Sequence, residues 1–153
     1  MSLKVLRVYI ENSVIGGYFD EEFEVPTRKL FDLFKTGVYK PVISSHVIKE
    51  LDDGAPDYVK NILTTIDCEI QEMNREMQEL AKIYIDHNAV TINYINDALH
   101  IAIATVLGVD VLVSWNFRHI VNLDRIKIFN AVNIMQGYKA IEIRSPKEVL
   151  KDE

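Results

Sequence analysis

The pattern of apolar and polar residues along the chain predicts short strands that are separated by helices. Residues 4–10 are β-branched and aromatic, which is typical of a strand. Similar apolar runs predict further strands at 41–44, 67–71, 109–113 and 140–143. Helical spacing and helix-starting residues predict helices at about 26–35, 45–51, 56–65, 74–85, 96–107 and 125–136, with short helices after residue 12 and at 146.

Small polar residues and burial patterns refine these elements. Asn12 or Ser13 is expected to cap the first short helix, and Asn96 the helix at 96–107. The helix at 96–107 is apolar on nearly every side, and the strand at 109–113 is wholly apolar apart from one aspartate. Both are therefore expected to be buried, the strand at the centre of a parallel sheet.

The alternation of strands and helices indicates an α/β fold with a mostly parallel sheet and helices on both faces. The chain has 153 residues and shows no repeat or linker, so residues 1–153 are expected to form a single domain. Ligands of such sheets bind beyond the carboxyl ends of the strands, where the strand order reverses. The polar residues that follow the strands are therefore the candidates for function.

Composition and charge narrow the class of protein. The chain is 48% hydrophobic and 26% charged, as soluble globular proteins are. The single cysteine excludes an internal disulfide, and neither a signal peptide nor a long apolar span is evident, so a cytoplasmic location is expected. The net charge of −6 argues against binding of nucleic acid through neutralisation of its phosphates by basic residues alone. If the protein binds nucleic acid, a metal or a local basic patch must offset the repulsion.

Three carboxylates and an amide lie near strand ends or helix starts. Glu11 follows the first strand, Glu50 lies one turn into the helix after the second, and Asp97 opens the apolar helix. Asn116 follows the strand at 109–113, two residues after Ser114. Oxygen ligands of this kind suit Mg²⁺ or Mn²⁺, which activate water and stabilise charge on a phosphoryl group.

Each of these residues also has an ordinary structural interpretation. Asp97 fits the first turn of a helix through the dipole alone, and Glu50 fits a solvated helix face. Asn116 and Ser114 fit helix caps, whereas packing explains Glu11 poorly. The other residue types give no further candidate site. No phosphate-binding glycine motif is present, and no residue near Cys68 in the sequence suggests that it is a nucleophile. The histidines lack the spacing of metal sites and are interpreted as structural or surface residues (His46, His87, His100, His119).

Four segments resemble the motifs of PIN-domain proteins, in order and in spacing, over essentially the whole chain. They are VYIENSVIGGYF at 8–19, SSHVIKEL at 44–51, NDALHIA at 96–102 and, after the next strand, SWNF at 114–117. The chain is most similar to the group of VapC-like toxins of bacterial and archaeal toxin–antitoxin pairs. The resemblance implies a three-layer α/β/α PIN-like fold, Mg²⁺- or Mn²⁺-dependent ribonuclease activity, a homodimer and often an antitoxin partner.

The resemblance also implies roles for individual residues. Glu11, Glu50 and Asp97 match the three acids that bind metal and act in catalysis, and Asn116 falls where a fourth acid is common. Ser13 and Ser114 would lie beside the metal or the substrate.

Two positions depart from the family pattern. Glu11 replaces the usual aspartate and lengthens the arm by ~1.5 Å. Asn116 is uncharged where the family often has an acid, so the cluster carries three negative charges instead of four. Weaker metal binding is therefore expected, because metal affinity depends on ligand charge and rigidity.

Two functions of different class follow from the sequence. The first is an endoribonuclease that hydrolyses RNA phosphodiesters with a carboxylate-bound Mg²⁺ or Mn²⁺. The second is a catalytically weak or inactive PIN domain that binds RNA or a protein partner, an alternative motivated by Glu11 and Asn116. A phosphatase or a flavodoxin-like nucleotide binder on a similar sheet has no motif in its favour, and fold alone does not assign function.

Overall fold

Five parallel strands form one sheet in the computed structural model, which describes residues 4–151. The strand order is β3-β2-β1-β4-β5, and each neighbouring pair is parallel. This confirms the α/β class, and the described sheet is wholly rather than mostly parallel. The strands are β1 (Leu6–Ile10), β2 (Tyr39–Ser44), β3 (Glu69–Gln71), β4 (Val111–Val113) and β5 (Glu142–Arg144).

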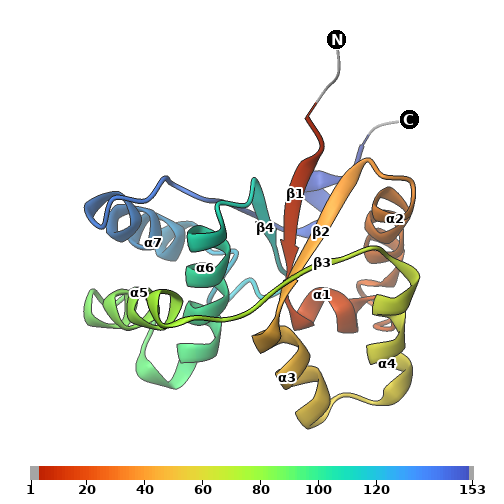
Figure 1. Ribbon diagram of the computed structural model, residues 1–153, viewed down its shortest axis with the longest axis horizontal. Helices are drawn as coiled ribbons and strands as arrows, with labels where there is room; N and C mark the ends of the chain where they lie inside the picture. The colour runs from red at the N-terminus through yellow and green to blue at the C-terminus, as the bar shows by residue number, and fades with distance from the viewer. Residues whose placement is uncertain (1–3, 152–153) are drawn as a thin grey trace.

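Helices cover both sides of the sheet (Figure 1). The helices α5, α6 and α7 lie together on one side, and α1, α2 and α4 lie on the other, with α3 beyond the carboxyl end of β2. The α-helices are α1 (Asn12–Gly17), α2 (Glu24–Lys35), α3 (Ser45–Gly54), α4 (Asp57–Asn61), α5 (Arg75–Asp86), α6 (Ile95–Leu107) and α7 (Leu123–Met135). The described residues also include the 3₁₀ turns η1 (Ile62–Thr65), η2 (Ile92–Tyr94) and η3 (Pro146–Val149).

The core lies where β1, β4 and α6 meet the flanking helices. All three residues of β4 are buried, and most of α6 is buried as its all-round apolar sequence predicts. Val8, Ile10 and Leu112 are fully buried. No helix within residues 4–151 is long and apolar enough to cross a membrane.

Helix starts are where the structure differs from the sequence-based expectation. Glu11, rather than Asn12 or Ser13, caps α1, because its carboxylate accepts a hydrogen bond from the Ser13 backbone. Asn96 does not cap α6, since the turn η2 runs directly into this helix and places Asn96 inside its first turn. The longer arm of Glu11 and the preceding 3₁₀ turn thus replace the short polar caps.

Other element boundaries shift for similar local reasons. The helix expected at Pro26 begins at Glu24, whose N–H donates to the carbonyl of Asp20, so that the preceding turn continues into α2. The helix expected at 56–65 divides into α4 and η1, and the helix expected at Pro146 is the 3₁₀ turn η3.

The strand order positions the candidate site. β1 is the central strand, and the chain adds β2 and β3 on one side of it and β4 and β5 on the other. The order therefore reverses at β1, and the carboxyl ends of β2, β1 and β4 lie side by side there. This is the place at which parallel α/β sheets bind ligands.

Candidate active site

Glu11 lies at the carboxyl end of β1 and is only 5% exposed. Its carboxylate accepts hydrogen bonds from the Ser13 backbone N–H, at 3.2 Å, and from the Ser13 hydroxyl. Burial raises the pKa of Glu11 above its ordinary value of 4.5, although the charge of His100 and the bonds from Ser13 oppose this shift. The Glu11 carboxylate is therefore costly to ionise unless a cation lies beside it.

Ser13 joins the ends of β1 and β4. Its Oγ accepts a hydrogen bond from the Trp115 backbone N–H at 2.9 Å and lies 3.4 Å from the Ser114 hydroxyl. The Ser114 Oγ in turn accepts from the Asn116 backbone N–H at 2.9 Å. The two serines thus hold the segment after β4 against the start of α1.

Asp97, in the first turn of α6, meets the segment after β4 through two side chains. His119 places Nδ1 at 3.3 Å from Asp97 Oδ2 and stacks on Tyr94, with ring centroids 3.6 Å apart. Asn116 acts to lower the pKa of Asp97, and its Oδ1 accepts hydrogen bonds from the backbone N–H groups of Arg118 and His119. Burial nevertheless raises the pKa of Asp97, with His119 opposing the shift.

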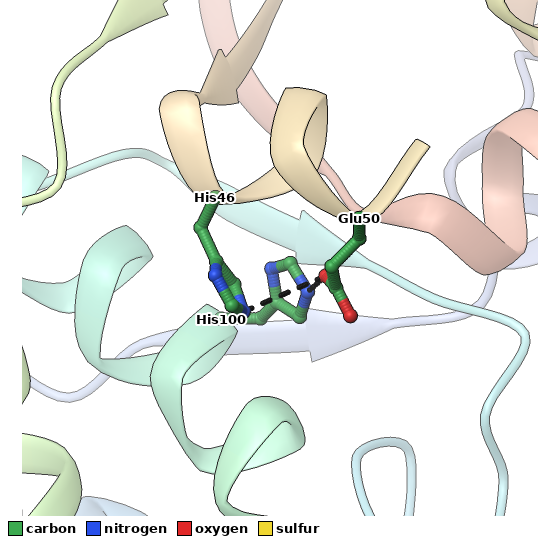
Figure 2. A group of neighbouring side chains, drawn as sticks. All are labelled: His46, Glu50 and His100. Atoms are coloured by element: carbon green, nitrogen blue, oxygen red, sulfur yellow. Dashed lines mark hydrogen bonds and ion pairs between the residues drawn. The ribbon is translucent and has the colours of Figure 1, made fainter. Parts of the chain in front are cut away.

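Glu50 points from α3 toward His100 of α6 (Figure 2). His100 Nε2 lies 2.6 Å from Glu50 Oε1, and His46 Nε2 lies 3.6 Å from the same oxygen. Burial alone would raise the pKa of Glu50, but the hydrogen bond and charge of His100 outweigh it and lower the pKa. Burial, reinforced by the charge of His100, lowers the pKa of His46.

His100 is fixed from its other side. Its Nδ1 is hydrogen-bonded to the Tyr9 hydroxyl at 2.9 Å, and that hydroxyl lies 2.9 Å from Ser44 Oγ. Burial holds the pKa of Tyr9 far above its ordinary value, so Tyr9 remains a neutral hydroxyl. Tyr9 and Ser44 therefore set the position of the His100 ring.

The three predicted acids gather around His100 without forming one compact set of ligands. The charge of His100 acts on Glu11, Glu50 and Asp97 alike. Within residues 4–151, the group of three or more potential ligand atoms that lie within 4.8 Å of one another is His46, Glu50 and His100. Glu11 and Asp97 lie outside that group.

Sequence reasoning missed the histidines of the site. His46, His100 and His119 are buried and lie beside the acids Glu50 and Asp97, whereas His87 is exposed. The sequence did indicate that His46 and Glu50 lie close together, because they are four residues apart on α3 and therefore share a face of this helix.

The residues present fit a divalent cation. Glu11 and Asp97 are acids whose pKa burial raises, and neither forms an ion pair with a lysine or arginine in the described part of the chain. A cation among them would stabilise the ionised carboxylates, and oxygen donors are those that Mg²⁺ and Mn²⁺ prefer.

The chain has the PIN-like α/β/α fold that its motifs predict. A solved structure of this architecture is that of VapC20 from Mycobacterium tuberculosis, a toxin that cleaves the sarcin–ricin loop. The similarity covers 88% of this chain and 98% of the VapC20 chain, with a TM-score of 0.53 and 13% sequence identity. No protein-family model matches the chain, and no curated protein matches its sequence.

Proposed function

We propose that the protein is a metal-dependent endoribonuclease of PIN type and the toxin of a toxin–antitoxin pair that acts in the cytoplasm. The observation that carries this proposal is the gathering of three acids from three elements around His100, beyond the carboxyl ends of the strands. The similarity in fold to the toxin VapC20 supports it.

In this proposal Glu11, Glu50 and Asp97 hold Mg²⁺ or Mn²⁺. A bound divalent cation supplies an activated water and stabilises charge on the phosphoryl group. The remaining residues orient the acids: Ser13 holds Glu11, and His119 holds Asp97. The cation also offers the RNA backbone a positive contact on a chain of net charge −6.

The decisive test is RNA cleavage by the wild-type protein and by Asp97→Asn, which keeps the shape of the side chain and removes its charge. Wild-type protein is expected to cleave RNA with Mn²⁺ or Mg²⁺ and to stop when the metal is chelated. Asp97→Asn is expected to lower the rate by roughly 100-fold or more, because changes even to outer-shell partners of a metal cost about 10- to 100-fold.

Asp124→Asn is the matched control. Asp124 also lies in the first turn of a helix, α7, but is exposed and has no place in the candidate site. This variant is expected to cleave RNA like the wild type. Equal metal-dependent cleavage by Asp97→Asn, or none by the wild type above the level of that variant, would remove the nuclease proposal.

Two contacts favour the second candidate function, a catalytically weak PIN domain that binds RNA or a protein partner. The Glu11 carboxylate already caps α1, and the amide oxygen of Asn116 already accepts two backbone hydrogen bonds. These hydrogen bonds occupy acceptor sites on both groups that a metal ion would also use, which favours weaker metal binding. Fluorescence anisotropy with the same RNA separates the two functions: binding without metal-dependent cleavage indicates the binding module.

A further inference from the structure

The cluster of His46, Glu50 and His100 has ligand chemistry of its own. Two imidazoles and one carboxylate, from α3 and α6, direct their ligand atoms to one place (Figure 2). From this arrangement we propose that these residues bind one divalent transition-metal ion of the Zn²⁺ type. The site shares Glu50 with the proposed ribonuclease site. The proposal nevertheless goes beyond the ribonuclease function and does not depend on it, because it requires neither RNA nor the acids Glu11 and Asp97.

A buried nitrogen without a partner points into the cluster. His46 is 8% exposed, and its Nε2 forms no hydrogen bond with any described residue. Glu50 Oε1 is its nearest ion-pairing atom at 3.6 Å, which is too long for a hydrogen bond. Buried polar atoms almost always have partners, and leaving one unmatched costs about 1–3 kcal/mol. A metal ion at this nitrogen would provide the missing partner.

The spacing of the three ligand atoms suits a tetrahedral ion. Metal–ligand bonds of about 2.0–2.1 Å place tetrahedral ligands about 3.3 Å apart. Glu50 Oε1 lies 2.6 Å from one imidazole nitrogen and 3.6 Å from the other, and all three atoms lie within 4.8 Å of one another. The two distances from Glu50 Oε1 thus bracket the spacing that a tetrahedral ion requires.

His100 carries the outer contact that metal-binding histidines usually have. Its Nδ1 is bonded to the Tyr9 hydroxyl, which is bonded to Ser44. When Nε2 binds a metal, any proton on Nε2 is released to solvent. The proton that the imidazole keeps lies on Nδ1 and is donated to Tyr9, whose own proton is donated to Ser44. Such outer contacts fix the tautomer and orientation of a ligand histidine.

The ligand types select the class of metal. Imidazole suits Zn²⁺, Cu²⁺, Fe²⁺ and Ni²⁺, whereas Mg²⁺ prefers oxygen ligands and water. Three protein ligands also leave a fourth position open, as sites that bind water or substrate do. The site is therefore expected to bind Zn²⁺ or Co²⁺ in the presence of a large excess of Mg²⁺.

The test uses the full chain without a histidine tag, stripped of metal and titrated with Co²⁺ and Zn²⁺. Co²⁺ binding is followed by its visible absorption and Zn²⁺ binding by calorimetry, each with excess Mg²⁺ present. Wild-type protein is expected to bind one equivalent. His46→Ala is expected to weaken binding by roughly 100-fold or more, since outer-shell changes alone cost about 10- to 100-fold.

Two histidine variants serve as matched controls. His87→Ala removes an exposed imidazole, and His119→Ala removes a buried imidazole that lies beside Asp97 instead of Glu50. His87→Ala is expected to bind Co²⁺ like the wild type. His119→Ala tests whether the ion lies instead at Asp97, which His119 contacts. Glu50→Gln repeats the test of the cluster if circular dichroism shows that His46→Ala does not fold, and it is expected to lose binding in the same way.

Three results would overturn the proposal: no Co²⁺ or Zn²⁺ binding by the wild type, undiminished binding by folded His46→Ala or Glu50→Gln, or equal loss in His119→Ala. The last result would place the ion at Asp97. The RNA assay separates this proposal from the nuclease proposal. Co²⁺ binding without RNA cleavage removes only the nuclease, and Mg²⁺-dependent cleavage without Co²⁺ binding removes only the transition-metal site.

Discussion

At the residue scale, Trp115 connects the segment after β4 to the start of α2. Its indole Nε1–H donates to Thr27 Oγ1 at 2.9 Å, and its ring stacks on Phe23 with centroids 4.3 Å apart. The close approach of this indole requires glycine at position 17. A Cβ on Gly17 would lie 2.8 Å from two atoms of the Trp115 ring.

We expect Gly17→Ala to lower the free energy of unfolding by about 1–3 kcal/mol, the usual cost of overpacking. Gly16→Ala is the control, because a Cβ on Gly16 meets nothing within 4 Å. That variant is expected to be neutral or to stabilise by up to about 1 kcal/mol through helix propensity. Urea denaturation of both variants measures the difference, and equal stabilities would contradict the packing described for Trp115.

At the element scale, Arg7 on β1 ties an edge of the sheet to a helix end. Its guanidinium donates to both carboxylate oxygens of Glu69 on β3, at 2.5 and 3.1 Å, and to the carbonyl of Leu107 at the end of α6, at 2.9 Å. The hydrogen bonds from Arg7 lower the pKa of Glu69. Glu69 and Arg7 are partly buried, so their interaction is less screened by solvent than that of exposed pairs.

This pair predicts a dependence of stability on pH. Because the pKa of Glu69 is lower in the folded state than its ordinary value of 4.5, its contribution is fully present above that value and is lost as the pH falls through the folded-state pKa. Glu69→Gln is expected to destabilise the protein by about 1 kcal/mol at neutral pH, and the difference should shrink below pH ~4.

Thermal and urea unfolding between neutral pH and pH ~3 test this expectation, over the range in which an ordinary glutamate titrates. Glu79→Gln is the control, since Glu79 pairs with Arg75 on the exposed face of α5 and is expected to contribute less than about 0.5 kcal/mol. A wild-type advantage over Glu69→Gln that stays constant down to the lowest pH would show that the carboxylate charge is not what stabilises the pair.

At the scale of the whole molecule, we predict a homodimer. The apolar residues Leu30, Phe31 and Phe34 of α2 add no support for a dimer surface, because all three are buried in the core of the protomer. The prediction therefore depends on the resemblance to VapC-like toxins alone.

Light scattering over a concentration series is expected to give twice the 17.6 kDa mass of one chain. The mass should persist at high salt, which would disperse nonspecific ionic association. A single-chain mass at every concentration would contradict the dimer. Co-expression with the product of a neighbouring small open reading frame would extend the same measurement to the antitoxin.

Local sequence information accounts for much of the fold. Apolar periodicity located the strands and most helices, because alternation and helical spacing reflect burial of each segment on its own. Cap residues were less predictable. Ser44, a residue type that favours N-caps, caps α3, but Glu11 takes the place of Asn12 and Ser13 at α1. Which side chain reaches the free N–H groups depends on the direction in which the chain enters the helix, and this direction is set by packing.

The sequence by itself determined the α/β class, the order of strands and helices, and the placement of Glu11, Glu50 and Asp97 near strand ends or helix starts. Only the tertiary structure decided the strand order, the contact of Glu50 with His100, and the meeting of His46 with His100. These two histidines lie on α3, beyond the carboxyl end of β2, and on α6, which covers one side of the sheet, and their rings meet with centroids 5.0 Å apart. Contacts between distant segments depend on how whole elements pack, and local periodicity carries no record of that packing.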